Sequence, residues 1–495
     1  DIDTGIYSPS NGQIAFSTNG TERFKIDETG AITFTGSLDF TDAQNNTFIG
    51  TGAGDDRTTS AVANTGIGKE AGASIVAGDY NVAIGADAFS SSTSASRSVA
   101  IGRKALQANT INHNNTAVGY EALKTSDGGL DNTAIGKSTL AALTTSDYNV
   151  AVGSNCLLDN TTGHSNTAVG FEASKANLIG DTNVAVGYQA LYTNTDSDKN
   201  TAIGYQALKA YDNTTDNYSA HNTAVGYQAG LSATGAANRN TFVGSLTASG
   251  NTTAINNTAI GYYALAVNET GDQNVAVGAY ALDSYTGANA VGVGESALTS
   301  LTTGTGNTGL GFEAGKLIET GLYNTAVGYQ ALYSSVDGDG NVAVGYLALY
   351  NTTGDYNTAV GYEALKLNTA SSNTAVGYKA GDAITTGDLN VAIGTNSMTA
   401  NVDGDRNVAV GGNSLYSYDP ASNQDSYNVA VGAYAGFSDT VGKENTFVGG
   451  KAANGLTEGS YNVAVGTYAL DAASGTGDNN IAVGYASLGA NTSGT

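Results

Sequence analysis

The sequence predicts an all-β protein whose chain winds into a parallel β-solenoid of about 26 coils of about 17 residues. First, a nine-residue motif, seen at residues 324–332, recurs from residue 46 to the end of the chain. Second, the chain has 67 Gly but only 2 Pro, which suits many tight turns and unbroken hydrogen-bonded ladders. Third, the apolar residues of the motif lack helical spacing, and its Gly, Thr, Val and Asn are poor helix formers.

Each copy of the motif is numbered from its asparagine, which is place one. Place three is usually Ala, place four is Val, Ile or, once, Leu310, place five is always Gly, and place eight is always a small residue. Because so short a repeat cannot bury its own apolar face, we expect the copies to stack as coils. We expect two strands in each coil, at places two to four and six to nine, paired in parallel with those of the next coil.

Two places of the motif predict a structural ladder along the stack. Asparagines stacked at place one can form an amide ladder in which each side chain donates a hydrogen bond to the next coil. Glycine at place five suits a bend where a Cβ would clash or would force an unfavourable φ. In two successive coils these ladder residues are Asn324, Gly328, Asn341 and Gly345.

Large and small side chains exchange between two places of the motif. Place three is Phe instead of Ala in three copies, and place nine is then small instead of Leu. The pairs are Phe48 with Gly54, Phe242 with Ala248, and Phe447 with Ala453. Conservation of volume within one core would produce this exchange, so we expect places three and nine to share the coil interior.

Residues 1–45 do not carry the motif. Polar and apolar residues alternate at 13–16 and 22–26, and the Asn19-Gly20 pair between them is a strong hairpin signal. Residues 31–34 and 37–40 indicate two further short strands. We therefore divide the chain into an N-terminal β-hairpin and strand module, residues 1–45, and a repetitive β-solenoid shaft, residues 46–495.

The composition excludes several classes of partner. A net charge of −25 without any basic run repels nucleic acid and anionic membrane surfaces, so we expect neither as a partner. No stretch approaches 18 apolar residues, so no membrane span is predicted. The single cysteine, Cys156, excludes an internal disulfide framework and occupies place eight, where it is expected to pack as a small hydrophobic residue. The chain begins with neither Met nor a signal peptide, which indicates that it starts inside a longer one.

No catalytic constellation is apparent, and we expect no enzymatic activity. His113 and His164 lie three coils apart, so they cannot share a metal ion. Closely spaced acids resemble parts of a calcium loop, but the bidentate Glu of such a loop is missing, so they are either solvated turn residues or weak Ca²⁺ sites. These acids are Asp337, Asp339, Asp403 and Asp405. No cofactor other than this weakly bound Ca²⁺ is expected.

The tyrosines suggest two kinds of role. Tyr recurs at place six, where a ladder packed coil on coil competes with a surface on which sugar rings stack. Two copies are lengthened by insertions at residues 211–221 and 416–427, which must bulge out of the stack. Candidate receptor-binding residues in these insertions are Tyr211, Asn213, Asn217, Tyr218, Tyr416, Tyr418, Asn423 and Asp425. Such Tyr and Asn side chains suit adaptable recognition, although tolerated insertions without a partner would look the same.

The first strand of the motif is apolar on both faces, as in residues 149–153. A strand with one solvated face would alternate polar and apolar residues. One face therefore meets the coil interior, and the other needs a second surface. Since a thin coil has no second internal layer, we expect that surface to be another copy of the chain, and we expect a homotrimer.

Two stretches resemble known families. Residues 4–9, 17–23 and 26–27 resemble a module of marine bacteriophage tail-fibre and virion proteins. The motif Ser98-Val99-Ala100-Ile101-Gly102 and its many relatives resemble the head repeat of trimeric autotransporter adhesins. The second resemblance implies a trimer of β-solenoids of the left-handed β-roll type. The coil is some three residues longer than is usual in that family, and its neck, stalk and membrane anchor are missing.

Together these features predict the shaft of a phage tail fibre, located on the virion and extracellular. The expected partners are two further copies of the chain, other virion or tail proteins at the chain ends, and a glycan or protein of the host surface. One alternative is a trimeric adhesin filament on a bacterial cell surface. Another is a tailspike that depolymerises polysaccharide, for which carboxylate spacing alone is uninformative.

Overall fold

The computed structural model describes residues 5–9, 12–19, 21–35, 40–212, 220–471 and 476–489. It comprises two compact units, Asp1–Lys137 and Ser138–Thr495. Within the described ranges the chain forms strands and turns and no helix. The predicted all-β class and the parallel β-solenoid of about 17 residues per turn are confirmed.

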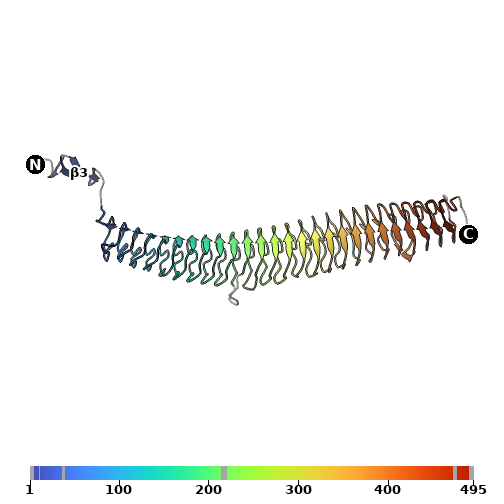
Figure 1. Ribbon diagram of the computed structural model, residues 1–495, viewed down its shortest axis with the longest axis horizontal. Helices are drawn as coiled ribbons and strands as arrows, with labels where there is room; N and C mark the ends of the chain where they lie inside the picture. The colour runs from blue at the N-terminus through green and yellow to red at the C-terminus, as the bar shows by residue number, and fades with distance from the viewer. Residues whose placement is uncertain are drawn as a thin grey trace. The chain divides into compact units, whose positions relative to one another are not determined.

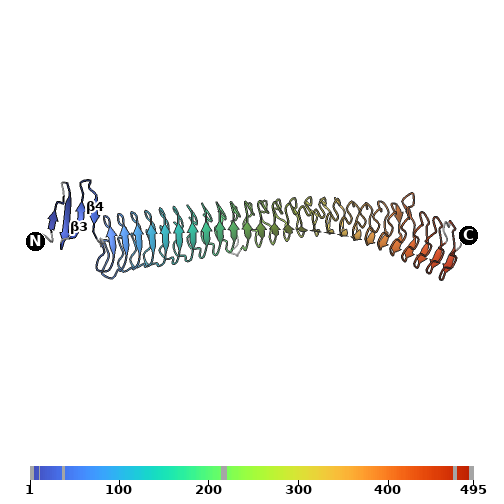
Figure 2. The same ribbon diagram turned by 90° about the horizontal axis from the view of Figure 1, so that it is seen from above.

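The N-terminal residues form a four-stranded antiparallel sheet in the order β1-β2-β3-β4 (Figure 2). Its strands are β1 (Gly5–Tyr7), β2 (Ile14–Thr18), β3 (Thr21–Ile26) and β4 (Ile32–Phe34). The predicted hairpin is the β2–β3 pair, and Asn19 in its turn has a φ of 52°. Of the further strand predicted at 37–40, residues 37–39 lie outside the described residues and Phe40 is not in a strand.

Each coil of the solenoid contributes one three-residue strand at places two to four. In the first unit these are β5 (Thr47–Ile49), β6 (Thr65–Ile67), β7 (Val82–Ile84), β8 (Val99–Ile101), β9 (Thr116–Val118) and β10 (Thr133–Ile135). In the second unit they are β11 (Val150–Val152), β12 (Thr167–Val169), β13 (Val184–Val186), β14 (Thr201–Ile203), β15 (Thr223–Val225), β16 (Thr241–Val243), β17 (Thr258–Ile260), β18 (Val275–Val277), β19 (Val291–Val293), β20 (Thr308–Leu310), β21 (Thr325–Val327), β22 (Val342–Val344), β23 (Thr358–Val360), β24 (Thr374–Val376), β25 (Val391–Ile393), β27 (Val408–Val410), β29 (Val429–Val431), β30 (Thr446–Val448), β31 (Val463–Val465) and β32 (Ile481–Val483).

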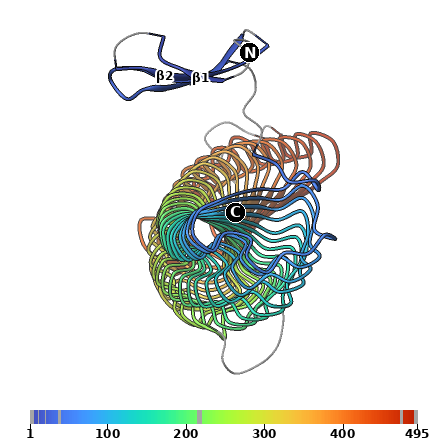
Figure 3. The same cartoon turned by 90° about the vertical axis from the view of Figure 1, so that its left-hand side faces the viewer.

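Strands of successive coils pair in parallel and in register, so equivalent places of the motif lie above one another. Val184 pairs with Thr201, and Ala185 pairs with Ala202. Within Ser138–Thr495 the strands, coloured from teal to red in Figures 1 and 2, lie side by side in chain order. Viewed along the stack in Figure 3, each coil of this unit is a single loop.

The second strand expected at places six to nine is not formed, and these places are turns. In the coil that begins at Asn183, Gly187, Gln189 and Leu191 have φ values of 133°, 51° and 52°. The backbone therefore alternates between right-handed and left-handed residues. Its N–H groups still bond between coils, since Gln189 donates to the preceding coil at 3.0 Å and Leu191 to the following one at 2.9 Å.

The coil interior holds the side chains of places three, eight and nine, which are buried in all but the first and last coils. Phe at place three fills the space that Leu at place nine takes elsewhere. A Cβ built on Gly54 would lie 2.7 Å from the ring of Phe48 in its own coil. A Cβ on Gly230, at place nine of the preceding coil, would lie 2.8 Å from the ring of Phe242. A Phe at place three therefore requires a small residue at place nine in its own coil or in the preceding coil.

The place-one asparagines form a buried hydrogen-bonded row. Asn324 Oδ1 accepts the backbone N–H of Asn341 at 2.9 Å, and Asn341 Oδ1 accepts that of Asn357 at 2.9 Å. The Nδ2 atoms of Asn324 and Asn341 donate to carbonyl oxygens late in their own coils, at 2.7 and 2.9 Å. These side chains therefore accept from the next coil, and the expected donation to the next coil is not their main bond.

The place-five glycines need both their φ and their missing Cβ. Gly328 has a φ of 131°, in a region that L side chains rarely adopt. A Cβ on Gly328 would lie 2.5 Å from the carbonyl oxygen of Gly345, the same place in the next coil. Stacked glycines therefore allow successive coils to approach at this bend.

Candidate functional site

The outward face of the strand row is apolar and only half covered. Place three points inward and is fully buried, whereas places two and four carry Val, Thr or Ile on the opposite face. Side chains at place four, such as Val169, Ile203 and Val376, remain 37–38% exposed. Within Ser138–Thr495 this face runs along the whole row of strands, so it is a long strip of Val, Thr and Ile that the described residues leave partly exposed.

Two aromatic columns lie at place six of the second unit. The first contains Phe171, Tyr188, Tyr205 and Tyr227, with ring centroids 5.1–5.5 Å apart and planes within 11° of parallel. The second contains Phe312, Tyr329, Tyr346, Tyr362 and Tyr378, with centroids 4.9–5.4 Å apart and planes within 15°. The expected tyrosine ladder is confirmed. Because each ring face inside a column covers its neighbour, sugars cannot stack along the column.

A polar row accompanies the first column at place seven. Gln189 Nε2 donates to Glu172 at 2.9 Å, and Gln206 and Gln228 each donate to the glutamine before them at 3.1 and 3.0 Å. The Lys175 ammonium bonds the other oxygen of Glu172 at 3.0 Å. The hydrogen bond from Gln189 and the lysine charge lower the pKa of the Glu172 carboxyl despite its partial burial. The polar side chains of this row therefore serve as hydrogen-bond and ion-pair partners for one another.

The first insertion does not present Tyr211 to solvent. This ring is fully buried at place twelve of its coil, and its hydroxyl donates to Asn238 Oδ1 at 3.1 Å. Burial raises the pKa of the Tyr211 phenol to about 12. The expectation that Tyr211 contacts a receptor is therefore wrong. Asn213, Asn217 and Tyr218 lie outside the described residues.

The second insertion is folded back onto earlier coils. Its strand β28 (Gln424–Asp425) pairs in parallel with β26 (Gly404–Asp405). Asn423 Nδ2 donates to the backbone oxygen of Thr386 at 2.9 Å, and Asp425 pairs with Arg406. Asn423 and Asp425 are exposed, so they lie on an anchored projection at the surface.

The two tyrosines of this insertion differ. Tyr418 is fully buried at place twelve, and burial raises the pKa of its phenol to about 12. Its expected contact with a receptor is wrong for the same reason as that of Tyr211. Tyr416 is half-buried, and its ring stacks on Phe437 at 5.0 Å.

The paired aspartates bridge coils and do not converge on a common point. Asp337 accepts the hydroxyl of Thr320 at 2.6 Å, and Asp339 accepts the backbone N–H of Leu322 at 2.7 Å. Asp403 accepts the hydroxyl of Thr386, and Asp405 accepts a backbone N–H of the preceding coil at 2.7 Å. Among the described residues, no three His, Cys, Asp or Glu side chains gather in a geometry that could hold a metal ion.

Place sixteen carries acceptors for the coil before it, a role that the sequence analysis missed. Asp198 accepts the backbone N–H of Asp181 at 2.8 Å, and Asp339 acts in the same way. His113 and His164 occupy this place too, where each Nδ1 accepts a backbone N–H at 3.0 Å. The signal in the sequence is the recurrence of Asp, Ser or His two residues before the place-one asparagine.

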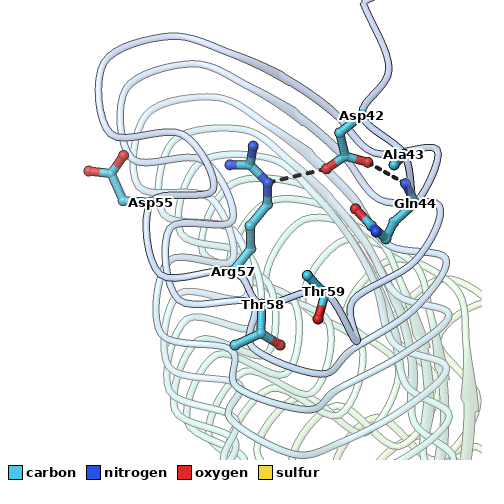
Figure 4. A pocket seen from close by; sticks show the side chains of 7 residues that line it. All are labelled: Asp42, Ala43, Gln44, Asp55, Arg57, Thr58 and Thr59. Carbon is cyan, nitrogen blue, oxygen red and sulfur yellow. Dashed lines mark hydrogen bonds and ion pairs between the residues drawn. The ribbon is translucent and has the colours of Figure 1, made fainter.

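A polar pocket of about 560 Å³ lies beside the first coil (Figure 4). Asp42 accepts the backbone N–H groups of Gln44 and Asn46 at 2.9 Å and the Nε of Arg57 at 3.3 Å. The N–H of Asn46 is the main cause of the lowered pKa of the Asp42 carboxyl. Asp42 thus supplies the acceptor that a preceding asparagine supplies in later coils. The guanidinium also covers the Phe48 ring, 5.2 Å from its centroid.

The remaining chemistry of the described chain is structural. Cys156 is buried at place eight, as predicted, and burial raises the pKa of its thiol to about 12. Nowhere in the described ranges is there a helix long and apolar enough to cross a membrane. No family model, curated protein or solved structure matches the chain.

Proposed function

We propose that this chain is the shaft of a bacteriophage tail fibre, an extracellular structural element of the virion that assembles as a homotrimer. The observation that carries the proposal is the long outward strip of Val, Thr and Ile at places two and four. An uninterrupted stack of coils builds a long element from local contacts alone, as a shaft requires. The resemblance of the N-terminal residues to phage tail-fibre modules supports a phage origin.

The occupant of the apolar strip is a further copy of the chain. The strip repeats with every coil, and a partner that matches it over many coils must repeat in the same way. A second and a third copy satisfy this condition because their strips have the same spacing. Exposed apolar surface of this extent otherwise favours aggregation.

The receptor of the fibre is a glycan or protein of the host surface, contacted by the second insertion. Its folded-back segment breaks the regularity of the shaft and exposes Asn423 and Asp425. Trimerisation presents the projection three times, so weak contacts sum through avidity. Tail and virion proteins bind at the ends of the shaft.

The assembly is tested with two variants that add the same negative charge to one coil, one on the proposed interface and one away from it. Val344→Asp buries a carboxylate in the proposed interface, whereas Asn351→Asp adds the same charge at an exposed position of that coil. Native mass spectrometry should find trimers for the unaltered chain and for Asn351→Asp, but monomers or unfolded chain for Val344→Asp. Val186→Asp should behave like Val344→Asp. A folded monomer of the unaltered chain would overturn the trimer.

The receptor role is tested separately by shortening the projection. Residues 422–425, which include Asn423 and Asp425, are removed so that this coil of 21 residues returns to the ordinary length of about 17, and adsorption of particles to host cells is measured. We expect adsorption to fall while the trimer mass and the thermal unfolding midpoint stay close to those of the unaltered fibre. Full adsorption by correctly assembled, shortened fibres would place the receptor contact elsewhere.

A further inference from the structure

We propose that the aromatic columns are sites of oxidative cross-linking, at which a peroxide-driven one-electron oxidant joins neighbouring coils through dityrosine. Neighbouring tyrosines in these columns lie in consecutive coils, their ring planes are nearly parallel, and both rings of each pair are accessible to solvent. Tyr188, Tyr205 and Tyr227 are 41–49% exposed, and so are Tyr329, Tyr346, Tyr362 and Tyr378. A third pair, Tyr333 and Tyr350, stacks at 5.0 Å on the same unit.

The stacking supplies the proximity that the coupling needs. Two tyrosyl radicals must meet before other reactions consume them, and two phenols held in one column meet without diffusion. The centroids of adjacent tyrosine rings are 4.9–5.4 Å apart along the columns. Exposed rings can change rotamer, which lets the carbon atoms ortho to the two hydroxyls come into bonding contact.

The step balances with hydrogen peroxide as the oxidant. Each of two phenols loses one electron and its hydroxyl proton to give a tyrosyl radical. The radicals form one C–C bond between their ortho carbons, and each ortho hydrogen then moves as a proton to its ring oxygen and restores the phenol. The two electrons and two protons released reduce one hydrogen peroxide to two water molecules, and a haem peroxidase delivers the oxidation in one-electron steps.

The chain contains its own contrast to the columns. Tyr80, Tyr148, Tyr323 and Tyr356 each directly precede a place-one asparagine and are 61–69% exposed, which is more than any internal column tyrosine. Among the described residues no ring contact joins these four to another aromatic ring. If exposure alone decided the reaction, these residues would react first. If stacking decides it, they stay unlinked within the chain.

The columns also tolerate a ring that cannot react. Phe171 and Phe312 already occupy place six and stack on the tyrosine that follows at 5.5 and 5.2 Å. Phe keeps the stack and removes only the phenol, so a Tyr→Phe variant separates the chemistry from the fold. Tyr205→Phe interrupts the first column at its centre and leaves the second column as an internal control.

The experiment treats the full-length chain with horseradish peroxidase and hydrogen peroxide, then maps linked peptides by mass spectrometry in the band of single-chain mass. We expect links between Tyr188 and Tyr205, Tyr205 and Tyr227, and neighbours within Tyr329–Tyr378, together with dityrosine fluorescence. Tyr205→Phe should lose both first-column links and keep those of the second, whereas Tyr148→Phe should change neither. Links distributed according to exposure, or no links inside the columns, would overturn the proposal whether or not the fibre is a trimer.

Discussion

The inward and outward rows of the solenoid obey different rules although both repeat once per coil. Inward places one and three, and the bend at place five, are held almost constant as Asn, Ala and Gly, because each of these residues meets the same place of the next coil. Outward, place six holds Phe171 and Tyr188 in one column but Ser245 and Gly450 elsewhere. The inward rows therefore specify the fold, and the outward rows are free to specify partners and chemistry.

The largest difference in the free energy of unfolding is expected when Gly→Val is made once at the constant place five and once at the variable place six. Gly328→Val, at the bend of place five, puts a Cβ 2.5 Å from the carbonyl oxygen of Gly345 and forces an unfavourable φ. We expect a loss of roughly 4 kcal/mol in the free energy of unfolding. Gly450→Val, at outward place six, meets nothing within 4 Å and should change it little. Denaturant unfolding followed by circular dichroism measures both, and equal losses would remove the distinction.

A buried carboxyl should make the free energy of unfolding depend on pH. Asp439 lies at inward place twelve, and burial raises the pKa of its carboxyl from 3.8 to about 7. Between these values the folded state keeps a proton that the unfolded state has released. The contribution of Asp439 to the free energy of unfolding is therefore highest below pH 4, falls as the pH rises to about 7 and is then constant, with a total change of a few kcal/mol.

Asp439→Asn should remove this pH dependence and stabilise the chain at pH 8. At the same place Asn401 accepts the N–H of Gly404 at 2.9 Å and donates to its carbonyl at 3.0 Å, which an ionised carboxylate cannot do. Unfolding midpoints measured from pH 4 to 8 give the slope, with exposed Asp55→Asn as the control. A slope that survives Asp439→Asn would assign it to other groups.

Substitutions in the asparagine ladder should lower the free energy of unfolding by a smaller amount, which depends on whether the new side chain can accept a hydrogen bond. Asn341→Ala leaves the buried N–H of Asn357 and the carbonyl of Gly354 without their side-chain partner, and we expect a loss of about 2 kcal/mol. Asn341→Ser should lose less, because Ser98 at the same place accepts the N–H of Asn115 through its hydroxyl at 3.3 Å. Thermal unfolding of the two variants compares them, and equal midpoints would show that the acceptor is unimportant.

The smallest effect is expected in an outward column. Tyr346→Ser removes a ring that stacks on two neighbours but is 42% exposed. We expect a loss of about 1 kcal/mol, since stacked aromatic pairs contribute little beyond their buried area. The same unfolding measurement applies. A loss as large as that of Gly328→Val would mean that the columns hold the coils together.

The sequence predicted the period, the parallel pairing and the identity of the inward places, because each of these follows from stacking one motif on itself. It did not predict the turns at places six to nine. Leu191 and Gln189 have left-handed φ values that non-glycine residues rarely adopt, and neither residue type signals them. Contacts between coils impose this backbone, and single-residue propensities cannot reveal it.

The sequence does not reveal at which residue each insertion begins. Tyr211 and Tyr418 were counted with the inserted residues, but both occupy place twelve, as buried Tyr285 does in a coil without an insertion. Aligning these three tyrosines by place would have put them in the core. The fold-back of β28 onto β26 brings Arg406 and Asp425, nineteen residues apart, into an ion pair that no short-range pattern indicates.

The direction of the strand ladder has a mechanical consequence. Strands that lie across the stack place their hydrogen bonds along it, so a pull along the stack loads each ladder in the direction of its bonds. Such ladders give way one coil at a time, because each coil bonds only to its neighbours. A coil of about 17 residues that comes free adds roughly 60 Å of extended chain in place of a rise of about 4.8 Å. A shaft of this kind lengthens in steps under tension, and single-molecule stretching of Ser138–Thr495 within the full chain should record a series of equal extensions of about that size.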